Sequence, residues 1–175
     1  MRSSVCLKGK PANLCGKPPV VGDPIPDFLL VNLALRDRRK ADFLGRPLLM
    51  SVVPSIDTSV CATSAKQFDA LAAEHPAATM VLVSTDLPFA QKRFVEETRI
   101  SRLIMLSLMR TDSFAKDFGL LIQDGPLAGL TARAVFVVNA DGILRYLEIV
   151  PEITEEPNYQ AAMAALTLLE AENTQ

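Results

Sequence analysis

Two short and almost wholly apolar runs, with one amphipathic segment between them, constrain the fold of this chain more than any other feature. Pro47–Val53 reads PLLMSVV and Thr79–Asp86 reads TMVLVSTD. Runs of this length and composition are typical of strands buried on both faces of a parallel sheet. Between them, Ala62–Glu74 carries apolar residues at helical spacing, including Ala65 and Phe68. The order strand, helix, strand predicts a βαβ unit and therefore an α/β fold.

The segments around this unit predict further strands and helices. Ser4–Leu7 and Pro11–Cys15 predict a hairpin that turns at Gly9-Lys10, and the prolines that follow exclude a helix before Phe28. The later elements are, in order, a helix over Pro88–Arg99, a strand over Leu103–Met109, a short helix over Ser113–Phe118, a hairpin from Arg133–Val138 and Ile143–Val150, and a helix over Asn158–Glu172. No repeat or linker divides the sequence, so we expect a single domain over residues 1–175, with the hairpin at 1–17.

Composition excludes several classes of function. A chain of 175 residues with 49% hydrophobic content is long enough for one well-packed core. Its net charge of −2 and its scattered Lys and Arg argue against a nucleic-acid partner. Neither a secretory signal nor a membrane-spanning run is present in the sequence, which predicts a soluble cytoplasmic protein. Three cysteines are too few for a disulfide framework, so we expect free thiols in a reducing compartment.

Cys61 occupies a position that favours a reactive thiolate. The strand ending near Val53 should deliver the chain to the carboxyl edge of the sheet, and Cys61 then falls in the first turn of the next helix. Unpaired amides and the positive end of the helix dipole stabilise an anion there. Thr58 is placed either to cap this helix or to aim its hydroxyl at the sulfur, and Pro54 contributes no competing donor. Position alone leaves a second interpretation equally open, that of a small cysteine buried as a hydrophobe.

The chemistry available to Cys61 is narrowed by what the sequence lacks. His75 is the single histidine, and fourteen residues of helix at about 1.5 Å each would separate it from Cys61, so it cannot act as a base for the thiol. We expect it to be a cation at a helix C-terminus. No cysteine pair has the spacing of a zinc site or of a CxxC redox motif, so no metal is expected. Direct attack on a peroxide O–O bond needs no base, and its product would be a sulfenic acid.

Three stretches carry a resemblance to a known family. Pro54–Cys61 reads PSIDTSVC and matches the PxxxTxxC signature of peroxiredoxins, and the longer stretch SVVPSIDTSVCATS resembles the thiol peroxidase subfamily. Ser84–Phe94 and Asp124–Val138 are similar to the same subfamily at matching spacing. The similarity covers essentially the whole chain. It implies a thioredoxin-like α/β fold of the peroxiredoxin type with an added N-terminal β-hairpin, and a homodimer.

The resemblance also implies roles for particular residues. Cys61 would be the peroxidatic nucleophile, Thr58 would hydrogen-bond the sulfur and the peroxide, Pro54 would shield the pocket, and Arg133 would be the active-site arginine. Displacement at the O–O bond moves charge from sulfur to the departing oxygen, so the guanidinium, Thr58 and the amides of Val60 and Cys61 would stabilise the transition state. Arginine suits this place because it does not lose its charge.

One position departs from the subfamily pattern. The subfamily usually has a second, resolving cysteine in the helix after DLPFAQKRF, where this sequence has Val95. Three explanations follow: an external thiol such as thioredoxin reduces the sulfenic acid directly, which we favour; Val95 is a natural or engineered loss that traps the protein; or Cys6 or Cys15 has become the resolver. With a turn at Gly9-Lys10, Cys6 would lie opposite Asn13 and Cys15 would be its diagonal neighbour, roughly 7–8 Å away, which makes a bridge between them marginal.

These observations predict a thiol-dependent peroxidase that reduces hydrogen peroxide and alkyl hydroperoxides through a Cys61 sulfenic acid. We expect recycling by thioredoxin or another thiol, no cofactor, and no membrane or nucleic-acid partner. The alternative is a peroxide sensor that uses the same thiolate without efficient turnover. An inactive interaction module of the same fold would require the set of Pro54, Thr58, Cys61 and Arg133 to be incidental.

Overall fold

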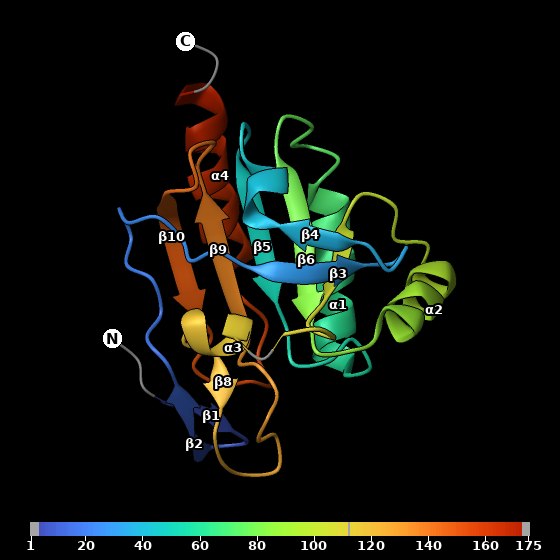
Figure 1. The fold of residues 1–175 in the computed structure, drawn as a ribbon, viewed down its shortest axis with the longest axis vertical. Coiled ribbons are helices and arrows are strands. Elements are labelled where there is room, and N and C mark those ends of the chain that lie inside the picture. Colours follow the sequence, from blue (N-terminus) through green and yellow to red (C-terminus); the bar gives the residue numbers. More distant parts are fainter. Residues whose placement is uncertain (1–3, 112, 173–175) are drawn as a thin grey trace.

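A seven-stranded mixed sheet forms the centre of the molecule in the computed structural model, which describes residues 4–111 and 113–172 (Figure 1). The strand order is β10-β9-β5-β6-β7-β3-β4. The strands are β3 (Leu29–Asn32), β4 (Asp37–Arg39), β5 (Leu48–Val52), β6 (Thr79–Ser84), β7 (Ile104–Ser107), β9 (Ala134–Val138) and β10 (Leu144–Ile149). β5, β6 and β7 pair in parallel, which confirms the βαβ prediction, and the outer pairs are antiparallel.

The helices connect these strands much as the sequence predicts. They are η1 (Lys40–Phe43, a 3-10 helix), α1 (Ser59–Leu71), α2 (Pro88–Thr98), α3 (Ser113–Asp117) and α4 (Tyr159–Glu172). α1 begins three residues before the predicted Ala62, because Thr58 is its N-cap, and it ends at Leu71 where the sequence predicts Glu74, since residues 72–74 form a turn. The strands β3 and β4, the 3-10 helix η1 and the two-residue strand β8 (Leu121–Ile122) were not predicted from the sequence. β4 is the three-residue edge strand DRR, and a short charged edge strand carries no apolar pattern.

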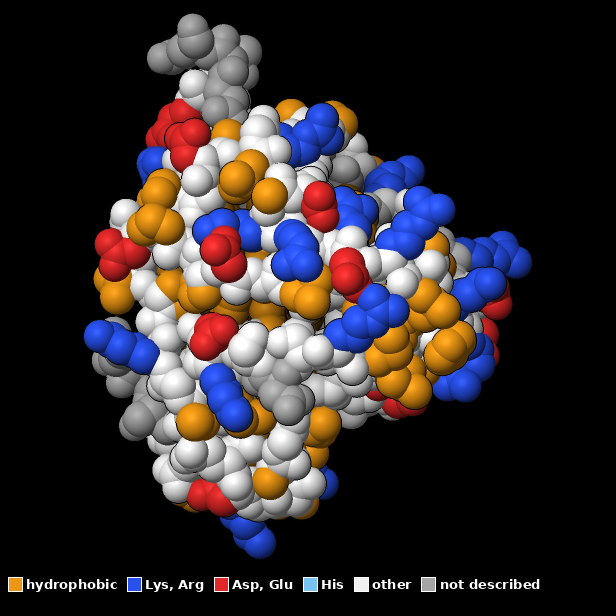
Figure 2. Space-filling model, in the orientation of Figure 1, with side chains coloured by type: hydrophobic (Ala, Val, Ile, Leu, Met, Phe, Trp, Pro, Cys, Tyr) orange, Lys and Arg blue, Asp and Glu red, His pale blue; other side chains and the backbone are white. Residues whose placement is uncertain are grey.

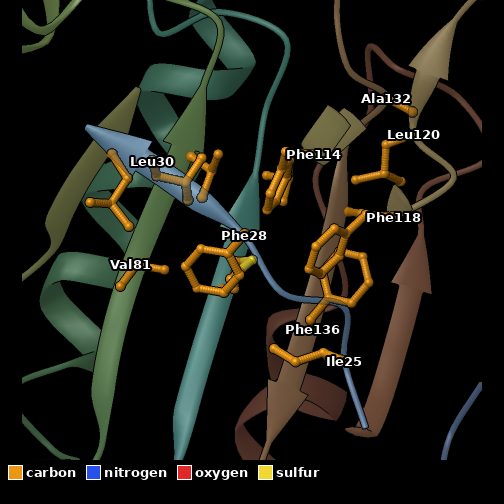
Figure 3. Packing of buried hydrophobic residues seen from close by; sticks show 14 of the residues in the cluster. Ile25, Phe28, Leu30, Val81, Phe114, Phe118, Leu120, Ala132 and Phe136 are labelled. Carbon is orange, nitrogen blue, oxygen red and sulfur yellow. The ribbon is translucent and has the colours of Figure 1, made fainter. Parts of the chain in front are cut away.

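The alternation of side chains along the central strands places a hydrophobic cluster on each face of the sheet. On one face, Leu49, Leu82 and Val135 pack against α1 and α4, which lie behind the sheet in Figure 1. On the other face, a group of aromatic rings packs in front of β5 and β9 (Figure 3). Phe114 stacks on Phe118 with ring centroids 4.3 Å apart. These two clusters hold the carboxyl ends of β5 and β6 in fixed positions.

A second, smaller sheet carries the N-terminal hairpin. It contains β1 (Ser4–Leu7), β2 (Lys10–Cys15) and β8 (Leu121–Ile122), and it lies below the main sheet in Figure 1. The predicted hairpin is present, but its turn is Lys8-Gly9, with φ of 51° and 77°, and not Gly9-Lys10. Two consecutive positive φ angles are typical of the tight turn that best matches strand twist.

This register corrects the predicted geometry of the N-terminal cysteines. Cys6 pairs with Pro11 and not with Asn13, which is opposite Ser4. Cys15 is therefore four residues beyond the partner of Cys6, or about 13 Å along the strand, which is too far for a disulfide. All three cysteines of the chain are free.

The surface in Figure 2 mixes both signs of charge, and apolar side chains gather on it over α2. Leu87 and Phe89, at the start of α2, are among the exposed large hydrophobic residues. Within residues 4–111 and 113–172, no helix has the length and apolar character needed to cross a membrane. The same residues contain no group of three or more His, Cys, Asp or Glu side chains placed to hold a metal ion.

Candidate active site

Cys61 lies in the first turn of α1, directly after the loop that leaves the buried strand β5. Thr58 is the N-cap, with φ −90° and ψ 143°, and its carbonyl accepts the N–H of Ala62 at 3.0 Å. The first amides of a helix, here including those of Val60 and Cys61, have no acceptor within the helix and can donate to an anion. The Cys61 side chain is fully buried. The predicted place of Cys61 at the helix start is confirmed.

Arg133 is the charged partner of this sulfur. It directly precedes β9, and the pairing of Val52 with Ala134 brings it beside the end of β5 although it is 72 residues from Cys61 in the sequence. Arg133 Nη2 donates to Cys61 Sγ at 3.3 Å. The side chain is 1% exposed. Among the described residues no acidic side chain pairs with Arg133, so the sulfur is the group that a buried guanidinium would most stabilise as an anion.

A single backbone carbonyl orients the guanidinium. Ile153 O accepts hydrogen bonds from Arg133 Nη2 at 3.1 Å and from Arg133 Nε at 3.4 Å. Arg133 Nη1 is buried and has no hydrogen-bond partner within the described part of the chain. A buried donor without a protein acceptor is costly, and here it lies on the group that also contacts the sulfur. The arrangement therefore provides a donor for a polar ligand beside Cys61.

The Thr58 hydroxyl differs in part from its predicted position, and Pro54 is buried in the same loop. The Thr58 hydroxyl donates to Ser55 O at 3.2 Å; it forms no side-chain cap, and no hydrogen bond from it to the sulfur is present among the described residues. Pro54 is buried, and its carbonyl accepts the Thr85 hydroxyl at 2.7 Å. Both residues belong to the loop that precedes Cys61, so the structure brings the predicted set together around one helix end.

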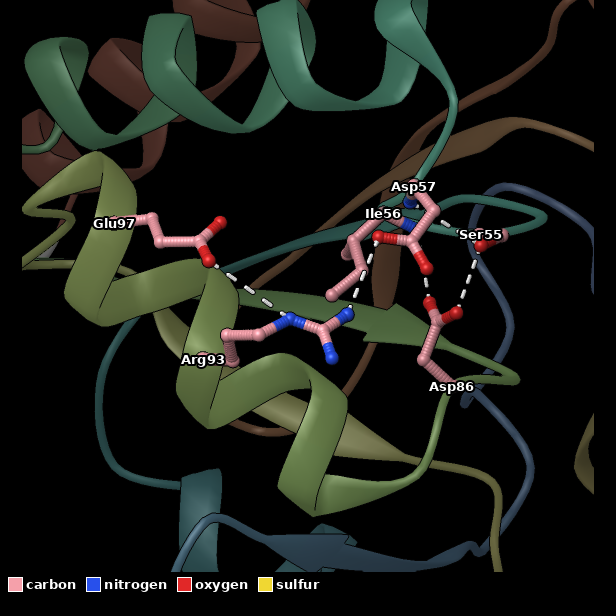
Figure 4. Close-up of polar contacts among 6 residues, drawn as sticks. All are labelled: Ser55, Ile56, Asp57, Asp86, Arg93 and Glu97. Atoms are coloured by element: carbon pink, nitrogen blue, oxygen red, sulfur yellow. Dashed lines mark hydrogen bonds and ion pairs between the residues drawn. The ribbon is translucent and has the colours of Figure 1, made fainter.

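The loop is held by a carboxylate that was not predicted from the sequence as part of the site. Asp86 follows β6 and accepts hydrogen bonds from Ser55 Oγ at 2.7 Å and from the Ile56 amide at 2.8 Å (Figure 4). Next to it, Arg93 lies 3.9 Å from Asp57, an exposed and weak ion pair. The parallel pairing of β5 with β6 was a usable signal, because the residues after two adjacent parallel strands meet at one edge of the sheet.

The other residues considered from the sequence lie away from the sulfur or lack the required chemistry. Val95 is on α2, half-buried, and packs against the hydrophobic cluster on the helix side of the sheet. His75 lies beyond the end of α1, and its Nδ1 is 2.7 Å from Glu170 Oε2 on α4, so it is held away from Cys61. Cys6 is on β1, where its backbone bonds to Pro151 and Ile153.

Comparison with known proteins places this geometry in a family. The Redoxin family model matches residues 20–163. The thiol peroxidase of Mycobacterium tuberculosis is 47% identical over 164 residues, covering 94% of this chain and 98% of the relative, and that of Leptospira interrogans is 47% identical over 165 residues, covering 93% and 96%. The crystal structure of a peroxiredoxin-like protein from Aquifex aeolicus has a TM-score of 0.91 and 38% identity, covering 97% of this chain and 98% of its own.

These relationships confirm the thioredoxin-like peroxiredoxin fold predicted from the sequence, and sheet β1-β2-β8 accounts for the added N-terminal hairpin. With Cys61 at the helix start, Arg133 on its sulfur and similarity along nearly the whole chain, the protein belongs to the redoxin family and, within it, to the thiol peroxidase group of peroxiredoxins.

Proposed function

We propose that this protein is a thiol-dependent peroxidase in which Cys61 reduces hydrogen peroxide and alkyl hydroperoxides. The observation that carries the proposal is the hydrogen bond from Arg133 Nη2 to Cys61 Sγ at 3.3 Å inside a buried site. The relatives named above are thiol peroxidases, which supports the enzyme over the sensor interpretation.

In the proposed reaction the Cys61 thiolate attacks the nearer peroxide oxygen. An S–O bond forms, the O–O bond breaks, and the departing oxygen takes a proton and leaves as water or an alcohol. Sulfur is thereby oxidised to a sulfenic acid. Arg133 Nη1 is the donor suited to the peroxide oxygens, since Nη2 and Nε are already engaged, and the amides of Val60 and Cys61 stabilise charge at the helix start.

An external thiol completes the cycle in this proposal. It attacks the sulfenic sulfur, releases water and forms a mixed disulfide, which a second thiol, as in thioredoxin, reduces to regenerate Cys61. Val95 offers no thiol on α2 for an internal disulfide. The homodimer, the cytoplasmic location and the single domain over residues 1–175 stay predictions.

Mass spectrometry after one equivalent of hydrogen peroxide tests the first step. We expect one added oxygen on Cys61, unchanged in Cys6→Ser and Cys15→Ser and abolished in Cys61→Ser. No oxidation of Cys61 in the wild-type protein would refute the peroxidase. Steady consumption of peroxide with thioredoxin and its reductase tests recycling. Peptide mapping under non-reducing conditions that linked Cys61 to Cys6 or Cys15 would contradict recycling by an external thiol alone.

A further inference from the structure

The N-terminal hairpin contacts the segment that orients Arg133. The Cys6 amide donates to Pro151 O at 2.7 Å, and the Ile153 amide donates to Cys6 O at 2.9 Å. β1 thus pairs with the chain that follows β10, through a bridge between Cys6 and Glu152. The carbonyl of Ile153, one peptide unit further, is the group that accepts both Arg133 hydrogen bonds. The hairpin is therefore bonded to the same residue whose carbonyl positions the guanidinium.

Glu152 fastens the tip of the hairpin to this segment. Its Oε1 accepts the Lys8 amide at 2.9 Å, and its Oε2 accepts the Gly9 amide at 2.9 Å. These are the two turn residues with positive φ. Oε1 also accepts the Thr154 amide at 3.2 Å and the Thr154 hydroxyl at 2.9 Å. Charge-assisted hydrogen bonds to a carboxylate are the stronger kind, so this side chain is well suited to fix the peptide on either side of it.

The ionisation of Glu152 agrees with this geometry. The hydrogen bond from the Gly9 amide is the largest cause that lowers the pKa of Glu152 from its ordinary 4.5 to about 2; burial opposes it, and the hydrogen bonds from Lys8 and Thr154 add to the lowering. The carboxylate therefore stays charged at the pH at which the enzyme would work. The residue next to Ile153 thus carries a charged acceptor on its side chain at that pH.

We propose that Glu152 is a positioning residue for the peroxidase reaction: by holding the Lys8-Gly9 turn it fixes the Ile153 carbonyl and, through it, Arg133 beside Cys61. The N-terminal hairpin is then part of the frame of the active site. This inference rests on the proposed function, since it assigns a role toward the same thiol. A displacement of about 1 Å at a reacting group can lower a rate as much as a hundredfold, so a small loosening here has a measurable effect.

Single-turnover oxidation of Cys61 in full-length Glu152→Gln tests the proposal, with Glu155→Gln as the matched control. Glu155 is exposed in the same loop, and its side chain forms no hydrogen bond among the described residues. We expect the rate constant with hydrogen peroxide to fall between about tenfold and a hundredfold in Glu152→Gln and to stay at the wild-type value in the control. Thr154→Val, which removes one hydrogen bond to Glu152, should show a smaller loss and serves if Glu152→Gln does not fold.

Alkylation of Cys61 by iodoacetamide separates positioning from general loosening. Cys61 is fully buried, so a merely structural defect exposes the sulfur and raises the alkylation rate. Positioning through Arg133 predicts that peroxide oxidation falls without any rise in alkylation. It also predicts that Glu152→Gln causes no further loss of peroxide rate in an Arg133→Met background, because the two residues act in series.

The outcomes distinguish this inference from the proposed function. A wild-type protein that fails to react with peroxide overturns both. If the wild-type protein reacts, three results overturn only the role of Glu152. These are oxidation of Glu152→Gln by peroxide as fast as wild type, faster alkylation of its Cys61, and a loss of rate that adds to that of Arg133→Met.

Discussion

Replacing Arg133 tests whether the peroxide step depends on an oriented guanidinium or on positive charge alone. Arg133 uses its planar group in two directions, with Nη2 3.3 Å from the sulfur and 3.1 Å from Ile153 O, while Nη1 is left for the substrate. A lysine ammonium is a compact point charge and cannot reproduce that fork. Arg133→Lys therefore keeps the charge but loses an oriented donor, and Arg133→Met loses both.

The structure sets the size of the two effects. Loss of one preorganised donor to a developing anion costs about 10²–10³ in rate, or about 3–4 kcal/mol. A full charge interaction at 3.3 Å is worth about 5 kcal/mol at an effective dielectric constant of about 20, which sets an upper limit on the contribution of charge. We expect Arg133→Lys to slow peroxide oxidation of Cys61 by about 10²-fold, and Arg133→Met to slow it further, toward about 10³-fold.

Rapid mixing with excess hydrogen peroxide, followed by an acid quench and intact-mass analysis, measures this rate. A Cys6→Ser, Cys15→Ser background leaves Cys61 as the single thiol. The thermal unfolding temperature of each variant shows whether the buried substitution perturbs the fold. If Arg133→Lys, folded as judged by that temperature, stays within tenfold of the parent, charge alone is sufficient and the orienting role given to Ile153 is wrong.

Three further predictions concern the frame around the site. Asp86→Asn should lower stability by about 2 kcal/mol in chemical denaturation and slow peroxide oxidation, because the carboxylate accepts two hydrogen bonds from the loop before Cys61; unchanged values in both assays would contradict this. Gly16→Ala should destabilise the protein by more than about 2 kcal/mol, because a Cβ there would lie 1.8 Å from the backbone carbonyl oxygen of Lys116. Gly22→Ala is the control: it has open space around it and φ +100°, and it should lose about 1 kcal/mol. Equal losses of stability for the two variants in calorimetry would count against the packing argument. Because Glu152 has a lowered pKa of about 2, its contribution to stability is complete above pH 4.5 and is lost as the pH falls toward 2. The wild-type protein should therefore lose more free energy of unfolding than Glu152→Gln across that interval. If the free energies of unfolding of the two proteins fall in parallel with pH, the role given to Glu152 in stability is wrong.

The sequence predicts the nucleophile well because its signal is local. A buried strand, a proline and a helix start fix where Cys61 must lie, and the structure confirms each of them. Arg133 is far away in the sequence, yet the motif around it marks it as the active-site arginine, and the antiparallel pairing of β9 with β5 brings it to the sulfur. Such residues are predictable because the register between two strands determines which residues lie beside each other at the strand ends.

The residues that support the site were harder to predict because they act through the backbone. Ile153 contributes a carbonyl, and any residue type carries one, so no side-chain pattern marks it. The hairpin turn was misplaced by one residue because glycine can occupy either turn position. The observed turn puts Lys8 at φ 51°, and Glu152 stabilises it from 144 residues away. A local propensity cannot anticipate a contact of that range.

The two ends of the described chain have different neighbours, and this matters for anyone attaching a label or fusion partner. Residue 4 begins the strand β1, whose next residues bond to the segment around Ile153, whereas Glu172 ends α4 on the opposite side of the molecule (Figure 1). A fusion partner attached before the hairpin would strain the hydrogen bonds between Cys6 and the segment around Ile153, whose carbonyl orients Arg133. Kinetic constants measured on such a fusion would therefore reflect the attachment as well as the enzyme. We expect an attachment after Glu172 to change the reaction less, because that end of α4 lies far from the hairpin (Figure 1).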